Sequence, residues 1–251
     1  MSPLIIIQAR TGSSRLPNKM IKEFYDGKPV LEILLERIKS VIEPANIIVA
    51  TTDRDSDSAI ADICRRSGID CFRGSEEDVL ARFIGAARQK GASRIIRICA
   101  DNIFIDTKAL KQLFDIGRDT DKDYVSFRKS DGTPSILTHY GFWAEYVTLA
   151  ALLKVAETTD EKLYHEHVTN YIHGNRHLFD CEFIPIPENI ESRTRLRLTM
   201  DTQADFDMQR TIYKDFKEGH IDITPDNLIA YLDGRPELYG HMESIINSNR
   251  K

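Results

Sequence analysis

The sequence predicts an α/β fold in which helices cover both faces of a sheet of mainly parallel strands. Short apolar runs alternate along the chain with longer segments that have an amphipathic helical pattern, which is typical of strands joined by crossover helices. The chain has 251 residues, of which 41% are hydrophobic, enough to bury one large core. We therefore expect a single domain that spans residues 1–251.

The first half of the chain shows this alternation most clearly. The expected strands are residues 4–8, 46–50, 70–72, 95–99 and 124–127, and the expected helices are residues 30–40, 56–67, 75–90 and 107–118. Asp57 and Ser75 stand where helices should begin, and Gly68 and Gly91 follow expected helix ends. Ligands of open parallel sheets bind beyond the carboxyl ends of the strands, so functional residues should follow these strands.

The second half of the chain has a less regular pattern. The expected strands are residues 138–144, 177–186 and 195–198, and the expected helices are residues 145–157, 160–173, 203–217 and 225–232. This order indicates an insertion at about residues 138–190, followed by a return to the main sheet.

Composition argues against nucleic-acid and membrane partners and indicates a compartment. The formal net charge is −5, whereas a nucleic-acid-binding surface is usually basic, so we expect no nucleic-acid partner. No apolar stretch is long enough to cross a bilayer, and we expect no membrane partner. The four cysteines form no CxxC pair and no zinc-spaced cluster, which is typical of thiols in a reducing compartment. We therefore expect a cytoplasmic protein.

A cationic loop follows the first expected strand. Residues 8–19 read QARTGSSRLPNK and combine small residues, hydroxyls and three cations, namely Arg10, Arg15 and Lys19. Gly12 would allow a close backbone approach, and successive amides of such a loop can cradle an anion. The alternative is an ordinary polar loop with solvated cations. The position at a strand end favours a triphosphate site, although the loop is neither a Walker A motif nor GxGxxG.

Two aspartates also follow apolar runs. Asp101 ends the run RIIRICAD, and Asp201 ends LRLTMD, with Asp205 one helical turn further on. Each alone is more simply explained as a turn residue or a helix cap. Together with the cationic loop they predict a magnesium site, because Mg²⁺ prefers one or two carboxylates with phosphates and water.

At these motifs the sequence resembles the cytidylyltransferases that make CMP-activated acidic sugars, including CMP-KDO and CMP-sialic acid synthetases, and most closely the SpsF-like branch. The resemblance rests on QARTGSSRLPNKM, RGSEEDVLARF, RIIRICAD, HYGFWAEY, EHVTNYI and LRLTMDTQADF, which occur in family order. It implies a Rossmann-like nucleotide-diphospho-sugar transferase fold with a mixed, mostly parallel sheet. It also implies that the insertion lines the substrate pocket and contributes to a homodimer.

The resemblance assigns roles residue by residue. The expected nucleotide-binding residues are Ala9, Arg10, Gly12, Ser13, Arg15 and Lys19. Arg15, Lys19 and Asp101 would be catalytic, Asp101 and Asp201 would bind Mg²⁺, and His139 and Tyr140 would line the sugar pocket.

Four further residues of these motifs have two readings. Asp78 and Arg82 either flank the site or form an exposed i,i+4 ion pair, and Glu166 and His167 either contact substrate or belong to a packed helix face. Relatives usually have a proline shortly after the first aspartate. Here Asn102 and Ile103 follow Asp101, so the turn is less rigidly fixed.

The function so implied is transfer of CMP from CTP to an acidic sugar or related anion, with release of pyrophosphate. A nucleotide-sugar-dependent glycosyltransferase is one alternative, but it usually carries a DxD signature, and the run here is Ala100-Asp101-Asn102. A non-catalytic nucleotide-binding homologue is the other alternative.

Overall fold

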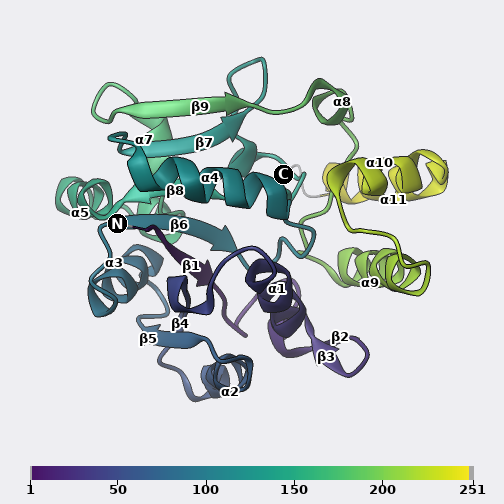
Figure 1. Cartoon of the computed structure of the whole chain (residues 1–251), viewed down its shortest axis with the longest axis horizontal. Helices are drawn as coiled ribbons and strands as arrows, with labels where there is room; N and C mark the ends of the chain where they lie inside the picture. Colours follow the sequence, from purple (N-terminus) through teal and green to yellow (C-terminus); the bar gives the residue numbers. More distant parts are fainter. Residues whose placement is uncertain (1, 249–251) are drawn as a thin grey trace.

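The computed structural model describes residues 2–248 and contains a seven-stranded sheet with the strand order β5-β4-β1-β6-β8-β7-β9 (Figure 1). The strands are β1 (Leu4–Gln8), β4 (Ile47–Thr52), β5 (Asp70–Gly74), β6 (Arg94–Cys99), β7 (Tyr124–Arg128), β8 (Glu145–Thr148) and β9 (Cys181–Pro185). Strand β8 is antiparallel to both β6 and β7, and the other pairings are parallel. The predicted mixed, mostly parallel sheet is confirmed.

Helices pack on both faces of this sheet, as predicted. They are α1 (Val30–Lys39), α2 (Ser58–Ser67), α3 (Val79–Gln89), α4 (Thr107–Asp119), α5 (Leu149–Thr158), α6 (Lys162–Glu166), α7 (Asn170–Gly174), α8 (Glu188–Glu191), α9 (Gln203–Glu218), α10 (Pro225–Asp233) and α11 (Pro236–Ser248). Side chains alternate along a strand, so β1 sends Ile5 and Ile7 into one apolar cluster and Leu4 and Ile6 into the other. The first cluster includes α1, α2, α4 and α9, and the second includes α3, α5 and α7.

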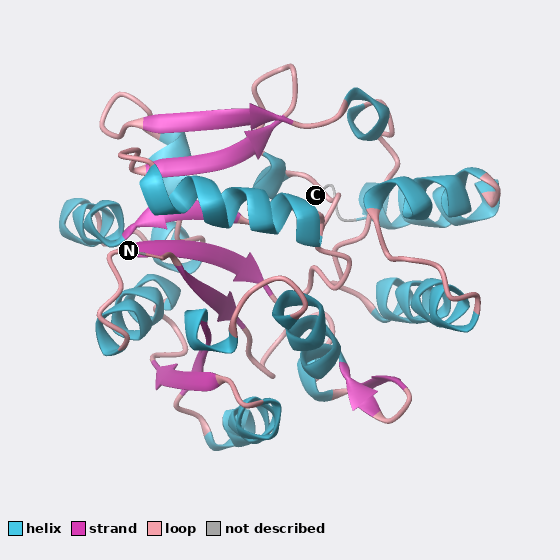
Figure 2. Cartoon of the chain, in the orientation of Figure 1, coloured by secondary structure: helices cyan, strands magenta, loops and turns pink. Residues whose placement is uncertain are grey.

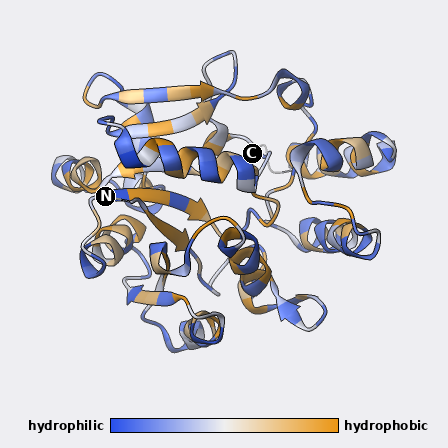
Figure 3. Ribbon diagram, viewed as in Figure 1, coloured by the Kyte–Doolittle hydropathy of each residue, from blue (hydrophilic) through white to orange (hydrophobic). Residues whose placement is uncertain are grey.

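The arrangement of the elements identifies the functional edge of the sheet. The arrowheads of β1 and β6 point toward the side on which α9, α10 and α11 lie (Figure 1). Figure 3 shows these two strands as mainly hydrophobic, which agrees with burial on both faces of the sheet. The loops that follow β1 and β6 therefore lie at this edge of the sheet.

The structure differs from the prediction around residues 138–157. Residues 138–144 are irregular, the strand begins at Glu145, and α5 begins only at Leu149. The ladder of β8 with β6 uses the residues that we assigned to the first turn of a helix. Thr148 ends that strand and caps α5 by accepting a hydrogen bond from the amide of Ala151.

Other differences lie in short elements. Residues 195–198 form no strand, and the expected helix 160–173 divides into α6 and α7. The hairpin of β2 (Glu23–Tyr25) and β3 (Lys28–Pro29), visible at the lower right of Figure 2, and helix α11 were not predicted. Within residues 2–248, every helix is too short or too polar to cross a membrane.

Candidate active site

Two adjoining cavities lie beyond the carboxyl ends of β1 and β6. The first has a volume of about 300 Å³ and is lined mainly by the loop after β1, and the second has a volume of about 460 Å³ and is lined mainly by residues 135–143. The residues that line both are Arg15, Arg97, Cys99, Asp101, His167 and Asp201. We call the first the nucleotide cavity and the second the acceptor cavity, because the predicted nucleotide-binding loop borders the first.

Most of the predicted nucleotide-binding residues line the nucleotide cavity. They are Ala9, Arg10, Ser13, Arg15 and Lys19. Of the predicted nucleotide-binding residues, all of which the structure describes, Gly12 is the one that does not line this cavity. It lies next to Glu76, and a Cβ on Gly12 would stand 3.2 Å from Glu76 Oε1. The left-handed turn of the loop is at Asn18, with φ 62°, directly before the short 3-10 turn that carries Lys19.

The buried carboxylate of Asp57 holds the loop after β1 in place through hydrogen bonds. Asp57 accepts hydrogen bonds from the Thr11 amide at 2.8 Å and from the Thr52 amide at 3.3 Å, and from both threonine hydroxyls. Burial alone would raise the pKa of the Asp57 carboxyl, but the hydrogen bonds from Thr11 and Thr52 hold it below its ordinary value. Asp57 stands at the start of α2 as predicted, but its side chain orders the loop rather than capping that helix.

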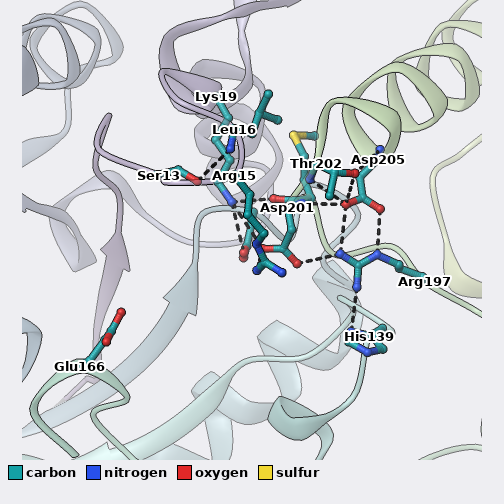
Figure 4. Close-up of polar contacts among 12 residues, drawn as sticks. Ser13, Arg15, Leu16, Lys19, His139, Glu166, Arg197, Asp201, Thr202 and Asp205 are labelled. Atoms are coloured by element: carbon teal, nitrogen blue, oxygen red, sulfur yellow. Dashed lines mark hydrogen bonds and ion pairs between the residues drawn. The ribbon is translucent and has the colours of Figure 1, made fainter. Parts of the chain in front are cut away.

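Lys19 lies close to both predicted metal-binding aspartates, and Figure 4 shows it together with Arg15 beside Asp201. Lys19 Nζ donates to the Met200 carbonyl oxygen at 2.5 Å and lies 3.5 Å from Asp101 Oδ2 and 3.9 Å from Asp201 Oδ1. Arg15 Nη2 is 3.0 Å from the same Asp201 oxygen. The two carboxylates thus meet around cations, and mutual repulsion between them is already offset.

A buried arginine holds Asp201 in place. Arg197 has 1% of its side chain exposed, and its Nη2 donates to Asp201 Oδ2 at 2.8 Å. Its Nε and Nη2 also donate to Asp205 at 2.8 and 3.0 Å, and its Nη1 lies 2.9 Å from His139 Nδ1. Burial would raise the pKa of the Asp205 carboxyl, yet the Arg197 guanidinium holds it below its ordinary value. Asp205 is therefore a structural anion for Arg197 and a capping-box partner of Thr202.

The predicted sugar-pocket pair is divided between two environments. His139 lines the acceptor cavity, and burial followed by the nearby Arg197 charge lowers the pKa of its imidazole. Tyr140 is buried, and its hydroxyl donates to the Glu191 carbonyl oxygen at 3.2 Å. Next to it, Gly141 has φ 72°, and a Cβ there would stand 2.7 Å from the Leu198 carbonyl oxygen. The backbones of the two segments are therefore in close contact beside the site.

Helix α6 packs against the outer side of the nucleotide loop. Glu166 Oε1 lies 3.8 Å from Arg10 Nη2, and both residues line the nucleotide cavity. His165 contacts Asp78 through Nδ1 at 2.8 Å and the Thr159 carbonyl through Nε2 at 2.9 Å. Glu166 and His167 thus border the cavities, and the packed-face reading does not apply to them.

The second reading of Asp78 and Arg82, an exposed i,i+4 ion pair, is wrong. Arg82 is 1% exposed and its Nη1 donates to the carbonyl oxygens of Ser75 and Glu76 at 2.6 and 3.1 Å. Asp78 caps α3 by accepting from the Ala81 amide at 2.8 Å. Arg82 lies on the buried face of α3, so it is not available for an exposed ion pair.

The donor set at the aspartates fits magnesium carried by a nucleotide. Asp101 and Asp201 supply hard oxygen ligands on either side of Lys19 Nζ. Residues 2–248 contain no group of three or more His, Cys, Asp and Glu side chains arranged for a metal ion. Mg²⁺ commonly takes one or two carboxylates, with phosphates and water as its other ligands, so the two aspartates would be enough protein ligands for it.

The most important residues that sequence reasoning missed are arginines and acids inside apolar runs. Arg97 lies within RIIRIC and Arg197 within LRLTM, and both are almost fully buried. A charged residue at an inward position of an apolar run is the signal that could have identified them, because such a charge requires a buried partner. The partners, Glu145 and Asp205, come from other elements.

Comparisons with known proteins agree with this geometry. A family model described as Cytidylyltransferase matches residues 4–226. The chain is 38% identical over 244 residues to an uncharacterized protein of Methanocaldococcus jannaschii, covering 97% of this chain and 93% of that protein. It is 31% identical over 239 residues to the spore coat polysaccharide biosynthesis protein SpsF of Bacillus subtilis, covering 93% and 95%. A solved cytidylyltransferase structure from Leptospira borgpetersenii is similar with a TM-score of 0.82 and 26% identity, covering 95% of this chain and 97% of that one.

Proposed function

Because the chain belongs to the cytidylyltransferase family, whose members are CTP-dependent nucleotidyltransferases, we propose that it transfers CMP from CTP to an acidic sugar or a related anion. The reaction releases pyrophosphate and serves the synthesis of a surface polysaccharide. The family and the fold inferred from the sequence motifs are confirmed. The acidic acceptor is the finer part of the proposal, and it is supported by the motif resemblance to enzymes that activate sugar acids.

One observation carries the proposal: Lys19 and Arg15 converge with Asp101, which follows β6, and with Asp201, which precedes α9, at the junction of two cavities. In the complex with CTP, Arg15 and Lys19 would move from the aspartates to the phosphates. Cations placed there stabilise negative charge that develops on the leaving pyrophosphate. In this proposal an acceptor in the second cavity would bring its hydroxyl beside the α-phosphate, and nucleotidyl transfer depends mainly on such positioning and on charge neutralisation.

Asp101 and Asp201 would hold Mg²⁺, which when bound neutralises phosphate charge and lowers the pKa of the acceptor hydroxyl. The protein's own contribution is orientation. Arg197 donates to Asp201 Oδ2, so the other oxygen, Oδ1, is the one that faces Arg15 and Lys19. His139 is held beside Arg197, and its lowered pKa keeps the imidazole neutral near pH 7.

The decisive experiment is a pyrophosphate-release screen of four nucleoside triphosphates against a panel of sugar acids and their neutral counterparts. We expect release with CTP and an acidic sugar only, and loss of almost all turnover in Asp101→Asn and Asp201→Asn or after EDTA treatment. Asp207→Asn is a matched control, because Asp207 lies on α9 and borders neither cavity. Release that is independent of the acceptor, or full activity of both variants, would contradict the proposal.

We also propose that the enzyme is cytoplasmic and works as a homodimer, since two-fold dimers are the commonest assembly of enzymes of this kind. Light scattering should then give about twice the chain mass of 28.7 kDa. A mass equal to one chain at working concentrations would exclude the dimer.

A further inference from the structure

Arg97 occupies an unusual position between the two cavities. It lies in the middle of β6, 5% exposed, and it lines both the nucleotide cavity and the acceptor cavity. Cys99, two residues further along the same face of the strand, also lines both. The side chain of Arg97 is therefore directed to the place where an acceptor would meet the nucleotide.

Only part of the guanidinium is used inside the protein. Nη1 donates to Glu145 Oε2 at 2.6 Å and to Thr169 Oγ1 at 3.1 Å. Nε is buried without a hydrogen-bond partner, and within residues 2–248 Nη2 donates to no protein acceptor either. An arginine has five N–H donors in a planar fork, so a group that is almost fully buried keeps donors for a ligand.

The partner of Arg97 is fully satisfied and rigidly placed. Glu145 is 1% exposed and accepts hydrogen bonds from Arg97, from Thr169 and from the Tyr124 hydroxyl. Arg97 and Glu145 also stand opposite each other in the β6–β8 ladder. The fork is thus held in one orientation before any ligand arrives, which is the condition for selective recognition of a planar oxyanion.

The acceptor cavity needs such a cation if its ligand is acidic. Asp101 and Asp201 line this cavity and would repel a carboxylate. Its two arginines are Arg97 and Arg15, and Arg15 faces Asp201 at 3.0 Å and belongs to the phosphate-binding loop. Arg97 is the lining cation whose donors are not committed to the nucleotide.

We propose that Arg97 binds the carboxylate of the acceptor and thereby selects a sugar acid over a neutral sugar. This inference rests on the proposed function, because it names the residue that recognises the acidic group in the same site. The α-phosphate of the nucleotide is another oxyanion that reaches this junction. Arg10, Arg15 and Lys19 already border the nucleotide cavity, so the carboxylate is the better-matched ligand.

The test uses binding, which requires no turnover. Trp143 is the single tryptophan of the chain and lines the acceptor cavity, so its fluorescence reports occupancy. The probes are 3-deoxy-manno-octulosonate and its neutral amide, and CTP binding is measured separately by calorimetry. The variants are Arg97→Lys and the double variant Arg97→Met with Glu145→Gln, which removes the buried charges together and avoids an unpaired one. Arg94→Met is the control, because Arg94 lies on the same strand and borders neither cavity.

We expect the wild type to bind the acid more tightly than the amide. Both Arg97 variants should bind the acid about 10- to 100-fold more weakly, while affinities for the amide and for CTP stay within about twofold. Arg94→Met should behave as the wild type. An unchanged acid-to-amide ratio in the variants, a loss that falls on CTP instead, or no preference for the acid in the wild type would each overturn the proposal. Absence of pyrophosphate release with every acceptor would contradict the proposed reaction, yet it would leave this binding result intact.

Discussion

Replacing Lys19 with methionine tests how charge is arranged in the site. Methionine keeps most of the side-chain volume and removes the ammonium that lies 3.5 and 3.9 Å from Asp101 and Asp201. A charge-assisted hydrogen bond to phosphate is worth about 1.5–3 kcal/mol, so CTP should bind about 10- to 100-fold more weakly. Calorimetric titration with CTP measures this directly.

Although Lys19→Met should bind CTP more weakly, it should bind Mg²⁺ more tightly than the wild type. A unit-charge pair near 4 Å is worth about 4 kcal/mol at an effective dielectric constant of 20, before desolvation is subtracted. With Lys19 gone, the two aspartates repel each other and attract a divalent cation. We expect the unfolding free energy to fall by about 1–3 kcal/mol. Mg²⁺ without CTP should raise the Tm of Lys19→Met but hardly that of the wild type.

Lys22→Met is the matched control. Lys22 comes three residues later, and its Nζ bonds to Gln203 Oε1 at 2.6 Å on the exposed surface. CTP affinity, Tm and the magnesium response of this variant should equal those of the wild type. If Lys19→Met binds CTP as tightly as the wild type and gains no response to Mg²⁺, Lys19 does not act as the cation of this site.

Three further predictions concern the framework around the site. Arg197→Lys should cost about 3–5 kcal/mol in urea unfolding, because it leaves the fully buried Asp205 poorly paired; a change below about 1 kcal/mol would contradict this. The Thr159 carbonyl and then Asp78 raise the pKa of His165 above its unfolded value, so its stabilisation is complete below about pH 6.5 and is lost as pH rises through the folded pKa. The Tm deficit of His165→Gln should accordingly be larger at about pH 5.5 than at about pH 8.5. Gly141→Ala should lower Tm by several degrees and weaken acceptor binding, because its φ is 72° and the new Cβ would collide with a backbone carbonyl at 2.7 Å.

The regular part of the fold could be predicted because its periodicity is strong. The buried runs of β1 and β6, and the amphipathic α4, follow directly from local pattern. Residues 145–148 were misassigned because their strand state depends on pairing with β6, which lies about fifty positions earlier in the chain. Local propensity carries no information about such a partner.

The same limit applies to the site. Arg10, Arg15, Lys19, Asp101 and Asp201 could be selected because each carries charge and follows an apolar run of the sequence. How they pair could not be predicted from the sequence. The structure places Lys19 close to both aspartates, directly after a turn at Asn18, and asparagine is one of the few non-glycine residues that readily adopt a left-handed backbone.

Because β8 is antiparallel to β6, the two cavities are lined by loops from separate parts of the chain. Because β8 starts at Glu145, opposite Arg97, and runs antiparallel to β6, the segment of residues 134–144 that precedes it lies at the functional edge of the sheet. The loop after β1, which we propose binds the phosphates, reaches that edge on the other side of β6. The two loops are anchored independently, the first by Asp57 and the second by contacts with Leu198. Under the proposed function, such a division would allow substitutions among residues 135–139 to change the acceptor while nucleotide binding stays the same.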